Sequence, residues 1–303
     1  MTVRLSALCL VLVCLLPVPG RAAAPATAAA AGDPGAVLDD LAKRQQALFA
    51  KAEKEGENLD EANFRQAAQK LVEDYDDFIK KYPKYAPVYA AYGTMLLRLD
   101  MNRQAAAVLI RGDAKFTDME KEPGVDGPAF RRNWALLKKE LGNYSAEEGH
   151  PVEAAGFFLA AIDLVPTEPL YHYELGRLLA EARDDFVKEG DRTRAEVDQS
   201  MQDAYRRAAE LAPERFEFQY DYAASFYGVE NPDWDAALRL WAVLEEKADS
   251  DLERDTMRLH AANVLIRQKK YDHARLMLAS VEQPGLDAQK QKLVAQLPAD
   301  PAK

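Results

Sequence analysis

The sequence predicts an all-α protein, folded as an α-solenoid of stacked antiparallel helix hairpins. From Ala36 onward, apolar residues recur at spacings of three and four, which is the period of an amphipathic helix. No convincing run of alternating β-branched residues appears, and strand-type turns such as Asn-Gly are missing. Prolines cut the chain into segments of ordinary helix length, at Pro83, Pro87, Pro123, Pro128, Pro151, Pro166, Pro169, Pro213, Pro232 and Pro284.

In chain order, the pattern divides into six hairpins and a terminal helix. Leu41, Leu48 and Phe49 mark the apolar face of the first helix, and the apolar face of the second helix runs from Phe64 to Ile79. We expect hairpins at residues 36–81, 86–116, 128–165, 168–212, 216–248 and 251–282, and a capping helix at 285–297. We expect the charged insert 183–199 to lengthen two helices past the stack, with a docking lip as the alternative.

Small residues recur twelve positions apart in three segments: Gly93 with Ala105, Ala224 with Ala236, and Ala262 with Ala274. A leucine follows each second small residue four positions later, at Leu109, Leu240 and Leu278, and a small or aliphatic residue follows seven positions later, at Gly112, Val243 and Val281. The same offsets, ending in a proline, occur at Leu71/Tyr75/Phe78/Pro83, Ala154/Phe158/Ala161/Pro166 and Met201/Tyr205/Ala208/Pro213. Antiparallel helices approach closely only where small residues meet, and one hairpin cannot bury its apolar face alone.

With these residues the chain resembles the tetratricopeptide repeat (TPR) family over roughly residues 60–286. The resemblance implies a right-handed superhelix in which the first helix of each hairpin lines the concave side. The sequence departs from the family pattern because no repeat is complete and the spacing between second helices exceeds the family's roughly 34 residues. The extra residues fall in 112–129, 142–150 and 183–199. The alternative is an irregular helical bundle with alanines at the helix crossings.

The N-terminal segment has the layout of a secretory signal peptide at residues 1–22. Arg4 precedes the apolar run LSALCLVLVCLL, which Pro17 ends, and this run is too short to span a bilayer. Cleavage after Ala22 has small residues at both required positions, and a cut after Ala26 is also possible, whereas a cut after Ala24 is unfavourable because Pro25 would follow. An uncleaved anchor or buried helix is the alternative. An Ala/Pro-rich linker at 23–35 follows, and residues 298–303 form a loose tail. We therefore expect a periplasmic or secreted protein with no transmembrane span in the mature chain.

Composition and missing motifs exclude several classes of function. The chain has 39 Lys and Arg against 50 Asp and Glu, which disfavours nucleic-acid binding. Both cysteines, Cys9 and Cys14, lie in the signal segment, so the mature chain has no thiol chemistry. No zinc-protease motif, nucleophile elbow or phosphate loop is present, so we expect no enzyme, no cofactor and no metal. His260 and His273 lie on two helices of one hairpin and could face each other.

The resemblance also implies a set of partner-binding residues on the first helices. Carrying the family's groove positions onto this sequence gives Thr94, Arg98, Lys139, Tyr173, Arg177, Asp221, Ser225, Asn263 and Arg267. Four of these are cations, which would form a basic line inside an acidic molecule. The alternative is that the arginines brace neighbouring helices.

The leading interpretation is a noncatalytic, exported scaffold that binds a protein or peptide partner in a concave groove, with self-association possible. One alternative is a cell-envelope assembly or structural factor that docks on a membrane complex. A carboxylate-dependent hydrolase is the third, although no arrangement of nucleophile and base supports it.

Overall fold

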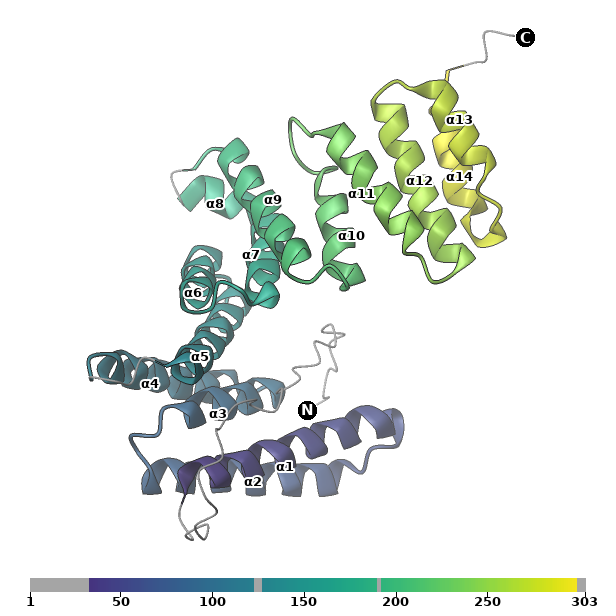
Figure 1. Cartoon of the computed structure of the whole chain (residues 1–303). Helices are drawn as coiled ribbons and strands as arrows, with labels where there is room; N and C mark the ends of the chain where they lie inside the picture. Colours follow the sequence, from purple (N-terminus) through teal and green to yellow (C-terminus); the bar gives the residue numbers. More distant parts are fainter. Residues whose placement is uncertain (1–32, 123–126, 190–191, 299–303) are drawn as a thin grey trace, which may run out of the picture.

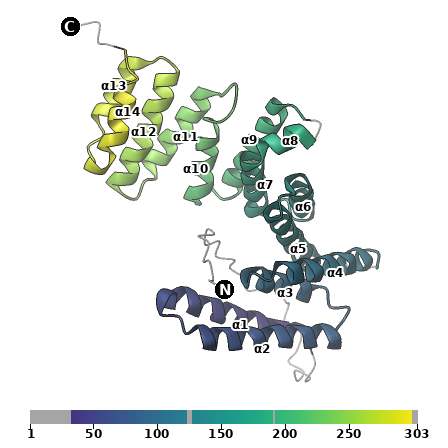
Figure 2. The same ribbon diagram turned by 180° about the vertical axis from the view of Figure 1, so that it is seen from behind.

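The protein is a curved stack of helix hairpins, described by a computed structural model over residues 33–122, 127–189 and 192–298. Helices and their connections account for these ranges, which contain no strand. The stack bends into an open arc, with α1 and α2 at one end and α12 to α14 at the other (Figures 1 and 2). None of the helices in these ranges has the length and apolar character needed to cross a membrane.

The six expected hairpins are present at nearly the predicted positions. They pair α1 (Pro34–Glu55) with α2 (Glu61–Lys81), α3 (Pro87–Arg98) with α4 (Asn102–Glu120), α5 (Pro128–Glu147) with α6 (Pro151–Leu164), α7 (Pro169–Glu181) with α9 (Arg194–Leu211), α10 (Phe216–Ser225) with α11 (Trp234–Glu246), and α12 (Asp251–Arg267) with α13 (Tyr271–Ala279). The one-turn helix η1 (Gly56–Asn58) joins α1 to α2, and η2 (Pro284–Leu286) leads into the capping helix α14 (Asp287–Val294).

Proline and capping residues set where these helices begin. Pro34, Pro87, Pro128, Pro151 and Pro169 each occupy the first helical position, where the missing N–H costs no hydrogen bond. Elsewhere side chains cap the free backbone donors: Asp60 begins α2, Asp233 begins α11 and Ser250 begins α12, while Thr193 and Glu196 form a capping box before α9.

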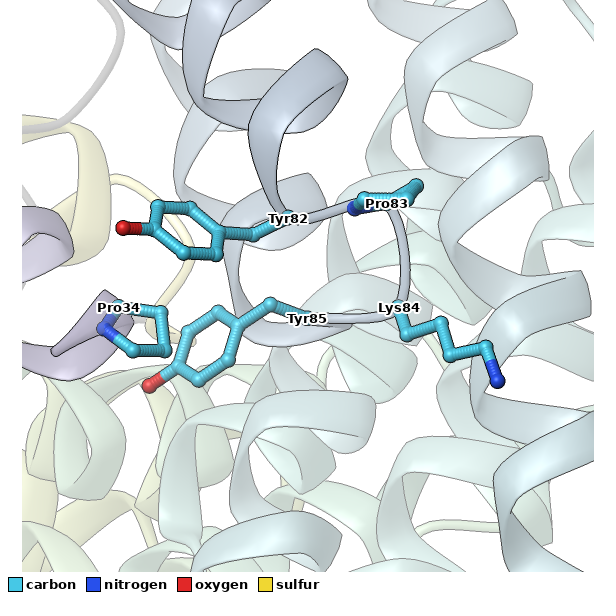
Figure 3. Close-up of a pocket in the computed structure, with 5 residues that line it drawn as sticks. All are labelled: Pro34, Tyr82, Pro83, Lys84 and Tyr85. Atoms are coloured by element: carbon cyan, nitrogen blue, oxygen red, sulfur yellow. The ribbon is translucent and has the colours of Figure 1, made fainter. Parts of the chain in front are cut away.

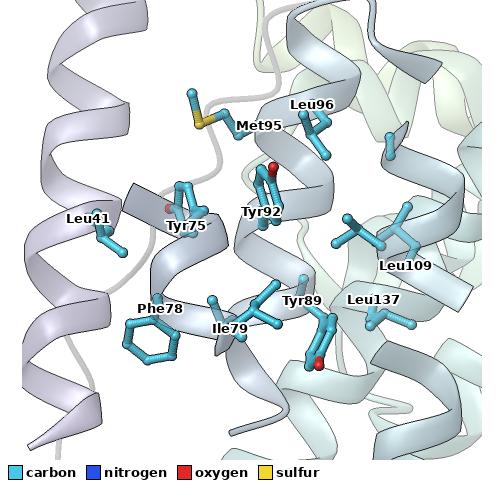
Figure 4. Close-up of a cluster of buried hydrophobic side chains, with 14 of the residues drawn as sticks. Leu41, Tyr75, Phe78, Ile79, Tyr89, Tyr92, Met95, Leu96, Leu109 and Leu137 are labelled. Atoms are coloured by element: carbon cyan, nitrogen blue, oxygen red, sulfur yellow. The ribbon is translucent and has the colours of Figure 1, made fainter. Parts of the chain in front are cut away.

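The repeated offsets lie in the core, as predicted. Leu71, Tyr75 and Phe78 of α2 are at most 3% exposed and pack with α3 and α4 in a cluster that joins the first hairpins (Figure 4). The rings of Tyr75 and Tyr92 stack with centroids 5.1 Å apart. The second-helix sets that begin at Ala105, Ala154, Met201 and Ala274 are likewise buried. The repeated small residues and the large residues four positions after them therefore identify the contacts between helices in these hairpins.

Gly112 shows why a small residue is required at such a crossing. A Cβ atom at this position would lie 2.4 Å from Cβ of Tyr89 on α3 and 2.5 Å from Cδ1 of Leu137 on α5. Helix α4 can therefore touch both neighbours only because residue 112 has no side chain.

The predicted register of the fifth hairpin is wrong by one residue. Ala236 and Leu240 are half-buried and Val243 is 41% exposed, whereas Ala237, Trp241 and Leu244 are at most 1% exposed. An irregular segment separates α10 from α11, at residues 226–233. Counting twelve positions from Ala224 therefore does not reach the buried alanine of α11, and the buried alanine of α10 is Ala223 rather than Ala224.

The prediction that the insert 183–199 lengthens two helices is wrong. The insert forms a separate short helix, α8 (Arg183–Glu189), beside the start of α9. Phe186 anchors α8 in the core at 4% exposure. Arg183 pairs with Asp198 at 3.1 Å and donates to the carbonyl of Gly228 at 2.7 Å. The charges of the insert therefore hold α8, α9 and the following hairpin together.

The other long segment, 112–129, extends α4 to Glu120. Asp113 on this extension accepts a hydrogen bond from Nε1 of Trp134 at 2.7 Å and pairs with Lys138 at 2.8 Å, both on α5.

The expected signal peptide at 1–22, most of the linker at 23–35 and the end of the tail lie outside the described residues. The last two linker residues, Pro34 and Gly35, form the first turn of α1. Asp33 caps this turn by accepting a hydrogen bond from the Gly35 N–H at 3.1 Å.

Candidate partner-binding face

The first helices of the hairpins lie toward the inside of the arc, and the second helices lie outside (Figures 1 and 2). We call the side formed by α3, α5, α7, α10 and α12 the inner face. Polar contacts join successive helices of this set. Thr94 on α3 donates to Glu140 on α5 at 3.1 Å, and Tyr173 on α7 donates to Asp221 on α10 at 2.6 Å. Further along, the hydroxyl of Tyr220 on α10 lies 3.1 Å from Nε2 of His260 on α12.

The structure brings Tyr173 and Asp221 together as the centre of this face. The Tyr173 hydroxyl lies 2.6 Å from Asp221 Oδ2 and 3.2 Å from Glu217 Oε1, while its ring stacks on Phe218 with centroids 4.5 Å apart. Burial raises the pKa of Asp221, the hydrogen bond from Tyr173 opposes this rise, and the charge of Glu217 adds to it. Two carboxylates thus share one phenol donor on the inner face.

The structure interrupts the basic line predicted from Arg98, Lys139, Arg177 and Arg267. Lys139 is buried, Arg98 and Arg177 pair with carboxylates, and Arg267 is exposed over aromatic rings. Arg98 turns toward α1, where it pairs with Glu53 at 2.7 Å and stacks over the ring of Phe49 at 3.8 Å. The alternative interpretation, that arginines brace neighbouring helices, describes this contact. Helices α1 and α3 are therefore held together by a guanidinium that was expected to face a ligand.

Lys139 differs most from the prediction, because its side chain is buried where an exposed cation was expected. Its side chain is 7% exposed and pairs with Glu140, itself 5% exposed, at 2.9 Å. Glu140 also accepts from Thr94 on α3 and from Asn143 on its own helix. Lys139 is therefore a buried structural cation with a compensating charge, and it is not available to a partner.

The remaining predicted residues are on first helices but differ in what they contact. Arg177 pairs along its own helix with Glu174 at 2.8 Å and with Glu181 at 3.2 Å. Arg267 is exposed over the rings of Trp234 and Tyr227, at 5.1 and 5.5 Å. Ser225 donates to the carbonyl of Tyr222 within α10. Asn263 is half-buried, and its side chain makes no hydrogen bond to another described residue.

The residues that the sequence reasoning missed are acidic. Glu140, Glu147, Glu174 and Glu217 join Asp221 on α5, α7 and α10. Partial desolvation and the charge of Glu140 raise the pKa of Glu147, which indicates an excess of negative charge there. Glu140 and Glu174 directly follow predicted positions, and Glu217 precedes Asp221 by four residues on one helix face. Glu140 and Glu174 are buried, and each pairs with a cation. The remaining acids in the middle of the inner face are Glu147, Glu217 and Asp221, and the nearby arginines, Arg177 and Arg215, are already paired.

His260 does not face His273. Its ring stacks on Trp241 with centroids 4.1 Å apart, and its Nδ1 lies 3.4 Å from the Tyr227 hydroxyl, so it packs on the preceding hairpin. His273 is exposed. Among the described residues, no group of three histidine, cysteine or acidic side chains is placed to hold a metal ion.

A cavity of about 400 Å³ lies at the turn between α2 and α3, beside the start of α1. The rings of Tyr82 and Tyr85 and the prolines Pro34 and Pro83 line it (Figure 3). Its surface is almost wholly apolar, and it contains none of the predicted binding residues. This cavity is therefore separate from the inner face.

No protein-family model and no curated protein matches the sequence. Among solved structures, PilF of Pseudomonas aeruginosa is similar with a TM-score of 0.54 and 11% identity, over 87% of this chain and 99% of that chain. MamA of Desulfovibrio magneticus gives a TM-score of 0.43 and 14% identity, over 70% and 98% of the two chains. YrrB, described as a TPR protein with an unusual peptide-binding site, gives 0.40 and 15%, over 65% and 93%. Together with the hairpin packing above, the similarity to PilF shows that this chain has the fold of a TPR-like α-solenoid.

Proposed function

We propose that this protein is a noncatalytic scaffold that holds a segment of a partner polypeptide along its inner face. The observation that carries the proposal is the pair of contacts between neighbouring first helices, Thr94 on α3 with Glu140 on α5 and Tyr173 on α7 with Asp221 on α10. A curved stack of hairpins presents such a surface in its bound shape, which lowers the ordering cost of binding.

The charge of this surface indicates the chemistry of the partner. Glu147 and Glu181 are exposed on the inner face, and Asp221 and Glu217 are half-buried beside them. Arg177 and Arg215 are the neighbouring cations, and glutamates already pair with both. Complementary charge speeds encounter and excludes partners of the wrong sign. We therefore expect the partner segment to be basic. The predicted basic line would instead have bound an acidic segment.

Export to the periplasm or full secretion is the second part of the proposal, and it rests on the sequence of residues 1–22. N-terminal sequencing of the protein from its native cells tests it. We expect the mature chain to begin after residue 22 or 26. A native protein that still begins at Met1 and remains in the cytoplasm would overturn export without affecting the scaffold.

The scaffold is tested by charge inversion on the inner face. Cross-linking in the native envelope identifies a partner, and its affinity is then measured for the variant Glu147→Lys/Glu181→Lys. Loss of complementary charge should weaken binding at least about tenfold, equivalent to about 1.4 kcal/mol. The matched control Glu61→Lys/Asp77→Lys inverts the same number of charges on α2, where both carboxylates are exposed, and should bind normally.

Two outcomes would contradict the scaffold. Equal affinity for both variants would remove the inner face from the interaction, provided that the helical circular dichroism of both is unchanged. Sedimentation of the chain with membranes that salt reverses, without any partner on the inner face, would favour the alternative of an assembly factor docked on a membrane complex.

A further inference from the structure

A second pocket lies at the edge of the stack, where the turn before α10, the end of α11 and the start of α12 meet. It has a volume of about 360 Å³ and a partly enclosed shape. Phe216 and Leu244 supply its apolar surface, and Glu214, Asp249 and Glu253 supply its carboxylates. None of these belongs to the set of residues predicted to bind a partner.

The aromatic ring of this pocket is unusually open to solvent. Phe216 is 40% exposed, while Leu244, which also lines the pocket, is 1% exposed. The ring of Tyr220 contacts Phe216 at a centroid distance of 5.9 Å. The pocket therefore combines a solvent-exposed aromatic ring with a buried aliphatic side chain.

The carboxylates around that ring lack cationic partners. Glu214, Asp249 and Glu253 form no ion pair with any described residue, whereas the nearby acids Glu217, Glu245 and Asp251 do. Glu253 accepts only the backbone N–H of Asp249, at 2.9 Å. The one cation of the pocket, Lys247, donates to the carbonyl of Pro213 at 3.1 Å. The pocket therefore carries a net negative charge next to a free aromatic face.

The same chain shows what such a combination holds elsewhere. Arg98 stacks over Phe49 at 3.8 Å and pairs with Glu53. Arg215 stacks over Phe218 at 4.4 Å and pairs with Glu217. In both cases a planar guanidinium covers a phenylalanine ring and reaches a nearby carboxylate, as an arginine does better than a lysine. The pocket brings the same two kinds of group together, a phenylalanine ring and carboxylates, without an arginine among its lining residues.

We propose that this pocket binds an arginine side chain of a partner polypeptide, with the guanidinium on the Phe216 ring, the alkyl stem over Leu244, and Glu214 and Asp249 as its counter-ions. The charge balance and the free ring select a cation with a planar head over an anionic or neutral group. The site is separate from the inner face and does not depend on the function proposed above.

The test is a nuclear magnetic resonance titration of the ¹⁵N-labelled chain with N-acetyl-arginine amide. The matched probe is N-acetyl-citrulline amide, which has the same shape without the charge. Arginine should produce saturable shifts of the Phe216 and Leu244 amide signals with a dissociation constant on the order of millimolar. Citrulline should produce none, and added salt should weaken the arginine response.

Variants locate the binding. Phe216→Leu and Glu214→Gln/Asp249→Asn should each weaken the arginine response at least about fivefold. Glu61→Gln/Asp77→Asn, which removes two charges from α2, should not. Equal shifts with citrulline, no saturable shift with arginine, or equal weakening by the control pair would overturn the proposal. Shifts of the same amides on raising the protein concentration alone would assign the pocket to a second copy and would also overturn it.

Discussion

Replacing Gly112 by alanine tests the close helix packing on which the fold depends. The new Cβ would lie 2.4 Å from Cβ of Tyr89, an atom next to the α3 backbone, and 2.5 Å from Leu137. The end of the Leu137 side chain can turn away, but Cβ of Tyr89 is fixed to the backbone, so α3 itself must move away from α4. Such overpacking costs about 1–3 kcal/mol.

Gly156 provides the matched control, because it also lies inside a helix and has no atom within 4 Å of the position a Cβ would take. Alanine in place of glycine favours a helix by about 1 kcal/mol at both positions. The difference between the two variants therefore isolates the overpacking cost. We expect Gly156→Ala to raise the free energy of unfolding, and Gly112→Ala to lie about 1–3 kcal/mol below it.

Urea denaturation followed by helical circular dichroism measures both values, and hydrogen exchange of α3 and α4 amides shows where Gly112→Ala acts. The local measurement matters because a stack of hairpins need not unfold in one step. Two variants with the same change in unfolding free energy would refute the close packing of α3, α4 and α5.

Two further predictions concern buried ionisable groups. Burial lowers the pKa of His260 from 6.5 to about 4. Between these values the unfolded chain binds a proton that the folded chain does not, so the free energy of unfolding should fall by up to about 3 kcal/mol as pH drops through this range. His260→Gln should lose that part of the pH dependence, and an unchanged slope in denaturation at pH 7, 5.5 and 4.5 would contradict it. Lys139→Met should lower the free energy of unfolding by about 3–5 kcal/mol, because Glu140 is left as an uncompensated buried charge. Lys139→Met/Glu140→Met should recover part of this loss in thermal denaturation, and a double variant no more stable than the single one would count against the pair.

The sequence was sufficient to predict the hairpins and most of their core. Offsets of four and seven from a small residue follow from helix geometry, so they identified Leu109, Phe158 and Leu278, each at most 2% exposed. The offset of twelve depends on the length of the connection between two helices. It failed at Ala236, where an irregular segment of the chain lies between α10 and α11.

The accessibility of the candidate site could not be predicted in the same way. Whether an arginine is free depends on a partner that can lie far away in the sequence, as Glu53 does from Arg98. Helical position alone also does not separate Lys139, which is buried, from the exposed cation expected there. Among the acidic residues of the inner face, Glu217 and Asp221 follow a short-range rule, a spacing of four on α10, and a search for like-charged pairs on first helices would have found this pair.

The inner face is tested most directly by site-specific photo-crosslinking in the native cells. A photoreactive residue is placed at Glu147 or Glu181 on the inner face, and at Ile110 or Leu276 on the second helices, where these side chains are 60% and 72% exposed. We expect covalent adducts with one partner protein from the inner positions and none from the outer positions. Adducts from Ile110 and Leu276 alone, or equal adducts from all four positions, would contradict a scaffold that binds along its first helices.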